Sequence, residues 1–105
     1  MKRIHYAGTS FVTGDDIAIS LVRYAGALAR SGSAAEVDVP VLAEGAAGRV
    51  QCLIGPSSQL VVEPAPAQAT ELLDEAVVAD LTRRAESLEA RWIGAGTMDF
   101  LDYDL

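Results

Sequence analysis

The sequence is poor in the residues that build disulfide-stapled or metal-bound domains. It contains one cysteine, Cys52, and one histidine, His5, in 105 residues. A single cysteine excludes a disulfide within the chain and is typical of a reducing compartment, so we expect a cytoplasmic protein. One histidine and one cysteine do not supply the four ligands of a structural zinc site, and no metal or cofactor is expected.

Long apolar runs and positive charge are also lacking. Half of the residues are apolar, but no run approaches the roughly 18 to 20 residues of a membrane helix, so no membrane span is expected. Eight Lys and Arg face fifteen Asp and Glu, and the net charge is -7. Because nucleic-acid binding requires a basic patch, direct contact with DNA or RNA is not expected.

The remaining pattern predicts one α+β domain over residues 1–92. One-sided strands and one-sided helices suit a two-layer sandwich, with an antiparallel sheet and two helices on one face, in the order β-β-α-β-β-β-α. The last three strands are expected to form a meander. Alternating apolar and polar residues place the five strands at residues 2–6, 11–12, 36–43, 49–54 and 59–63, and Val37, Val39 and Val41 are expected on one face of the third strand.

The first helix follows the acidic turn Thr13–Asp16. Thr13 or Asp15 is expected to cap its N-terminus, since both side chains accept hydrogen bonds from the free amides of a first turn. Apolar residues then recur at three- and four-residue steps. Gly32 provides a stop at its C-terminus.

The second helix is expected over about residues 72–92. Asp74 is its predicted N-cap, and Leu73 begins its buried stripe. Pro40, in the strand at 36–43, lacks the N–H that a sheet ladder uses. That strand is therefore expected at an edge of the sheet, or to carry a bulge there.

The last thirteen residues, Ile93–Leu105, are interpreted as a C-terminal tail. Gly94 and Gly96 are expected to break the helix, and acids then alternate with large apolar residues, with no Lys or Arg after Arg91. Such a segment is typical of a docking element on a second copy or on another protein. The expected partner-binding residues are Trp92, Met98, Phe100, Leu101, Tyr103 and Leu105.

A second candidate site lies in the first strands and in the turn at residues 55–59. His5 is a possible general base, and a hairpin would bring Ser10 close to it, while the turn contributes Ser57. No oxyanion motif or GxSxG sequence accompanies these residues, so no catalytic role is assigned.

The N-terminal IHYAG and the segment GRVQCLIGPSSQLV, which begins at Gly48, resemble short actinobacterial proteins of unknown function, over about residues 1–90. The resemblance implies a bacterial cytoplasmic origin and carries no activity or ligand.

Three hypotheses follow. The first is a non-enzymatic protein-interaction module that forms a homodimer or docks another protein through the tail. The second is a small-molecule-binding domain or modest enzyme near His5, Ser10 and Ser57. The third is an acidic inhibitor that mimics nucleic acid, because residues 71–105 contain nine acids and three bases.

Overall fold

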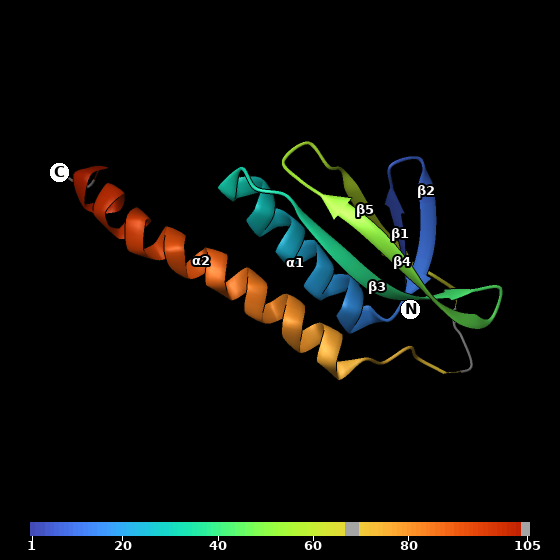
Figure 1. Cartoon of the computed structure of the whole chain (residues 1–105). Helices are drawn as coiled ribbons and strands as arrows, with labels where there is room; N and C mark the ends of the chain where they lie inside the picture. The colour runs from blue at the N-terminus through green and yellow to red at the C-terminus, as the bar shows by residue number, and fades with distance from the viewer. Residues whose placement is uncertain (67–69, 104–105) are drawn as a thin grey trace.

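The computed structural model describes residues 1–66 and 70–103, with side chains as far as Arg91. Both helices lie on one face of a five-stranded antiparallel sheet (Figure 1), which confirms the predicted two-layer α+β sandwich. The elements follow the predicted order: β1 (Lys2–Tyr6), β2 (Thr9–Thr13), α1 (Asp15–Ser31), β3 (Ala35–Ala43), β4 (Ala46–Ile54), β5 (Leu60–Pro64) and α2 (Glu75–Tyr103).

The strand order across the sheet is β4-β3-β2-β1-β5, and neighbouring strands are antiparallel. β5 pairs with β1, with Ile4 opposite Val62, and not with β4. The predicted meander is therefore wrong for its third strand. The chain crosses from one edge of the sheet to the other through residues 55–59.

The sheet curls so that its two edges meet at one end. In a flat sheet β4 and β5 would lie about 19 Å apart, at four spacings of about 4.8 Å. Residues 55–59 contain a tight turn, in which the Ser58 N–H donates to the Gly55 carbonyl at 3.0 Å, and this turn shortens the connection below that span. The Tyr6 hydroxyl donates to the Leu53 carbonyl across the closure.

One hydrophobic core lies between the sheet and the helices. Leu73, predicted to begin the apolar stripe of the second helix, is 70% exposed, because it lies in the connector that precedes α2. Eight core residues that follow the periods of the helices and of β3 are each at most 4% exposed: Ile17, Leu21 and Leu28 in α1, Val37, Val39 and Val41 in β3, and Leu81 and Ala85 in α2.

Pro40 lies in an internal strand, so the first of its two predicted positions, at an edge, is wrong, and the register of β3 with β4 runs past it without the alternative, a bulge. It is opposite Arg49 of β4, while the recorded pairing of β3 with β2 is Val12 opposite Leu42. The Pro40 carbonyl accepts a hydrogen bond from the buried Thr13 hydroxyl at 2.7 Å. Since the N and C=O of a strand residue face the same neighbour, the missing N–H also faces β2, and the proline interrupts the ladder there.

The start of α1 differs from the prediction. Its N-cap is Gly14, without a side-chain cap, in place of Thr13 or Asp15. The connector before α2 supplies the acceptor instead, because Glu71 Oε1 receives the Asp15 N–H at 3.2 Å. The C-terminal stop is confirmed: Gly32 adopts a left-handed conformation with φ 64°.

α2 begins as predicted, since Asp74 Oδ1 accepts the Val77 N–H at 3.1 Å. It then continues through Gly94 and Gly96 to Tyr103, so the predicted break is wrong. A glycine costs about 1 kcal/mol relative to alanine inside a helix, which weakens the helix without ending it.

The two helices start at the same end of the molecule and run side by side in the same direction (Figure 1). α2 has 29 residues and α1 has 17, so α2 is longer by about 18 Å. The molecule is accordingly elongated, at 55 × 27 × 21 Å, with a radius of gyration of 15.6 Å. A compact chain of this length has a radius of gyration of about 13 Å. Among the described residues, none of the helices is long and apolar enough to cross a membrane.

Candidate functional site

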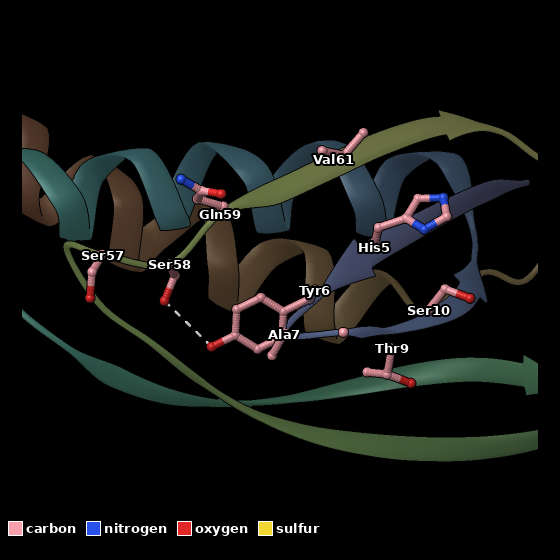
Figure 2. Close-up of a pocket in the computed structure, with 10 residues that line it drawn as sticks. His5, Tyr6, Ala7, Thr9, Ser10, Ser57, Ser58, Gln59 and Val61 are labelled. Atoms are coloured by element: carbon pink, nitrogen blue, oxygen red, sulfur yellow. Dashed lines mark hydrogen bonds between the residues drawn. The ribbon is translucent and has the colours of Figure 1, made fainter.

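A polar depression of about 1030 Å³ opens at the end of the sheet where its edges meet. The β1–β2 turn forms one side and the connection from β4 to β5 forms the other (Figure 2). The structure thus brings together the three ligand-site residues that the sequence singled out. The hydrogen-bonding side chains that line the depression are His5, Tyr6, Thr9, Ser10, Ser57, Ser58 and Gln59.

The β1–β2 turn sets the position of His5 and Ser10. Ala7 and Gly8 have positive φ angles of 52° and 79°, the combination that a two-residue hairpin turn requires. This turn fixes the register in which His5 lies directly opposite Ser10. Because paired residues of antiparallel strands point to the same face, both side chains lie on the face of the sheet away from the helices.

Tyr6 fixes the opposite wall of the depression. Besides its bond to the Leu53 carbonyl, its hydroxyl lies 3.4 Å from Ser58 Oγ (Figure 2). Ser58 Oγ in turn accepts the Gly55 N–H at 2.9 Å. The turn at residues 55–58 is therefore tied to β1, so the depression is preformed.

Glu63 completes a group that the sequence did not reveal. Its Oε1 lies 2.7 Å from His5 Nε2, and the two side chains are 52% and 45% exposed. Glu63 is also the register partner of Arg3 in β1. Both relationships depend on the pairing of β5 with β1, and the predicted meander concealed them.

A second, more apolar hollow of about 460 Å³ adjoins the depression at Ser10, which lines both. It lies beside the recorded β2–β3 pair, Val12 opposite Leu42, and both of these residues line it. Arg3 and Glu44 contribute charged groups to its wall. Its apolar lining consists of Phe11, Val12, Val41, Leu42, Ala43 and Val50.

The predicted partner-binding residues occupy a different region. Trp92, Met98, Phe100, Leu101 and Tyr103 belong to the C-terminal part of α2, which extends past the end of α1 (Figure 1). Their side chains, and Leu105 as a whole, lie outside the described residues.

The preceding part of α2 carries paired charges. Asp80 bridges Arg83 and Arg84, and Glu89 pairs with Arg23 of α1, whose Nε lies 3.0 Å from Glu89 Oε2. The hydrogen bond from Arg23 lowers the pKa of Glu89 below its ordinary value. These acids are partly neutralised by neighbouring arginines, so this part of α2 is not a uniformly negative surface.

Cys52 is 3% exposed, and burial raises the pKa of its thiol, which is the opposite of what a reactive thiolate needs. Within the described residues, no group of three or more His, Cys, Asp or Glu side chains could hold a metal ion. Comparison of the chain with protein-family models, with curated proteins and with solved structures finds no match.

Proposed function

We propose that the protein is an interaction module that forms a homodimer through the C-terminal part of α2. The observation that carries the proposal is the extension of this helix past the end of α1, over residues 92–103. We call these residues the projecting segment. The rest of α2 packs chiefly against α1.

The projecting segment needs a neighbour to be stable as a helix. Most of the stability of a helix in a protein comes from the packing of its apolar face, so the last turns of α2 gain little beyond α1 without a neighbour. Gly94 and Gly96 each lower helix stability by about 1 kcal/mol relative to alanine. A partner helix would offset this cost by burying the large apolar residues of the segment, which are Trp92, Ile93, Met98, Phe100, Leu101 and Tyr103.

Charge favours a second copy in antiparallel orientation. The projecting segment contains Asp99 and Asp102 and no basic residue, whereas the exposed Arg91 directly precedes it. If two copies cross near residue 95, Asp99 of one lies beside Arg91 of the other. A parallel pair would instead place acids beside acids, which is unfavourable.

Light scattering on the full chain and on a version ending at Ile93 tests this proposal. We expect a concentration-dependent dimer for the full chain and a monomer for the shortened one. Circular dichroism and urea unfolding must show that the shortened chain keeps its fold. A full chain that stays monomeric at high concentration would refute self-association and direct the search to another protein partner.

A charge exchange tests the orientation. Arg91→Glu and Asp99→Arg are each expected to weaken the dimer, and the double variant is expected to restore it. Arg83→Glu is the matched control, because Arg83 lies about two helical turns before Arg91 and is not beside Asp99 in this register. If the double variant dimerises no better than the single ones, the antiparallel register is wrong.

A second candidate function is the binding of a small polar molecule in the depression. The observation that favours it is the set of seven hydrogen-bonding side chains around one preformed volume of about 1030 Å³. Titration with small polar compounds should shift the NMR signals of residues 7–10 and 55–59 together. Shifts scattered over the whole surface would contradict a defined site.

The nucleic-acid mimic has less support, because Asp80 and Glu89 are engaged by arginines. It requires binding to a basic enzyme that weakens steeply with salt, and its test is a salt titration of such a complex.

A further inference from the structure

We propose that Ser10, His5 and Glu63 act as nucleophile, general base and orienting carboxylate in the hydrolysis of small carboxylic esters. The three residues lie on the adjacent strands β2, β1 and β5, on the sheet face away from the helices. This activity goes beyond dimerisation. It rests on the second candidate function, because an ester must first bind in the depression.

The geometry follows from the register of the strands. His5 and Ser10 are direct cross-strand partners, and the Cβ atoms of such a pair are about 4.5 to 5.5 Å apart. His5 Nε2 is held by Glu63 at 2.7 Å. The other ring nitrogen lies on the side of the ring nearer Ser10 (Figure 2).

In the free protein the Ser10 hydroxyl points away from the His5 ring (Figure 2), so the proposed reaction requires a rotation about the Ser10 Cα–Cβ bond that turns the hydroxyl toward His5 Nδ1. Contacts between a catalytic hydroxyl and its base are often long before substrate binds, so this free-state arrangement is compatible with catalysis. The bond to Glu63 holds the imidazole ring in place.

Two unlike hollows meet at Ser10, and they define the substrate class. The polar depression suits a hydroxylated or otherwise polar alcohol group. The adjoining hollow, lined by Phe11, Val12 and Leu42 among others, suits a short apolar acyl chain. An ester bound across both would present its carbonyl carbon at Ser10.

Arg3 supplies the positive charge that the developing oxyanion needs. It lines the apolar hollow together with Ser10, and it lies two residues before His5 on the same face of β1. A guanidinium group close to the carbonyl oxygen would stabilise the negative charge of the tetrahedral intermediate.

The reaction proceeds in two balanced steps. Ser10 Oγ attacks the ester carbonyl carbon while its proton passes to His5 Nδ1. The bond to the alcohol oxygen then breaks, and the His5 proton leaves with the alcohol, which yields an acyl-Ser10 intermediate. A water molecule attacks this ester with His5 again as base, releases the carboxylic acid and regenerates Ser10.

Covalent labelling of the full chain with a fluorophosphonate, followed by peptide mass spectrometry, tests the nucleophile. We expect the label on Ser10, loss of labelling in Ser10→Ala and unchanged labelling in Ser87→Ala, an exposed serine of α2 that lines neither hollow. Hydrolysis of p-nitrophenyl acetate and butyrate should fall at least about 100-fold in Ser10→Ala.

The positioning role of Glu63 has its own readout. Glu63→Gln should lower kcat for the same esters with little change in KM, and Glu63→Asp should recover part of the loss. Urea unfolding of each variant must show an intact fold. Absence of label on Ser10 in the unaltered protein, or equal turnover by Ser10→Ala, overturns the proposal. Ligand-induced NMR shifts without Ser10 labelling would leave the depression a binding site and reject catalysis.

Discussion

The Tyr6 hydroxyl, on β1, donates a hydrogen bond to the main-chain carbonyl of Leu53, on β4. β2 and β3 lie between these two strands in the sheet. The bond therefore does not belong to the ladder. It holds the curled sheet closed at the end where β4 passes into β5, and it forms one wall of the polar depression.

Removal of this hydroxyl should loosen the closure. Tyr6→Phe is expected to lower the free energy of unfolding by about 1 kcal/mol, because one hydrogen bond is lost and the Leu53 carbonyl is left without that donor. Urea unfolding measures the loss. Ser57→Ala, at an exposed position of the same turn, should change stability by less than about 0.5 kcal/mol. Equal changes in the free energy of unfolding for the two variants would mean that the Tyr6 hydroxyl does not stabilise the closure.

Two glycines at α1 should respond in opposite directions to alanine. A Cβ on Gly14 would lie 1.9 Å from the Leu72 carbonyl oxygen, so the connector must move, and we expect Gly14→Ala to cost about 2 kcal/mol. Gly26 lies inside the helix with open space around it, and Gly26→Ala should add about 0.5 to 1 kcal/mol. Thermal unfolding of both variants measures whether each melting temperature falls or rises. Two shifts in the same direction would contradict the packing of Gly14 against the Leu72 carbonyl.

The ion pair between the Met1 amino group and Asp15 Oδ1, at 2.9 Å, should make stability depend on pH at both ends of the range. The hydrogen bond with Asp15 raises the pKa of the amine above 8.0, and the same pair lowers the pKa of Asp15 below 3.8. The raised amine contributes stability that is lost as pH rises through its folded-state pKa. The lowered carboxylate contributes stability that is lost as pH falls through its own.

Asp15→Asn should therefore flatten both flanks of the profile of melting temperature between pH 3 and 10. Asp16→Asn, an exposed neighbour in the same helical turn, serves as the control. An Asp15→Asn profile that parallels the unaltered protein at both ends would mean that the pair contributes nothing to folding.

Cys52 should be protected from thiol reagents in the folded state. Its side chain is almost completely buried, and burial raises the pKa of the thiol, so little thiolate is present near neutral pH. Its reaction with a disulfide reagent should follow the urea unfolding curve. A Ser57→Cys variant in a Cys52→Ala background should react at once. Rapid labelling of Cys52 without denaturant would place the thiol at the surface.

The sequence predicted the helices and strands well where their positions depend only on local periodicity and on the residues that cap or end a helix. The buried stripe of α1 and the alternation of Val37, Val39 and Val41 follow from the period of helix and strand, and both are confirmed. The Gly32 stop and the Asp74 cap are likewise local, because each depends on the conformation or hydrogen bonding of one turn.

The candidate site was predictable only in part. The predicted hairpin brought His5 and Ser10 close together, but its second strand was placed at residues 11–12. In the structure β2 begins at Thr9, and the two-residue turn makes His5 and Ser10 direct partners. Glu63 was missed because it reaches His5 through a pairing between segments 58 residues apart. The continuation of α2 through Gly94 and Gly96 was also missed, since a glycine lowers helix stability without specifying where the helix ends.

The sequence by itself determined the class of the fold, the order of its elements and the faces that are buried, because hydrophobic period and capping are properties of neighbouring residues. Tertiary structure alone decided that β5 joins β1 and that Pro40 lies inside the sheet. Strand order depends on which edges meet when the sheet curls around its core. That outcome reflects the packing of the whole domain, and no local pattern in the sequence records it.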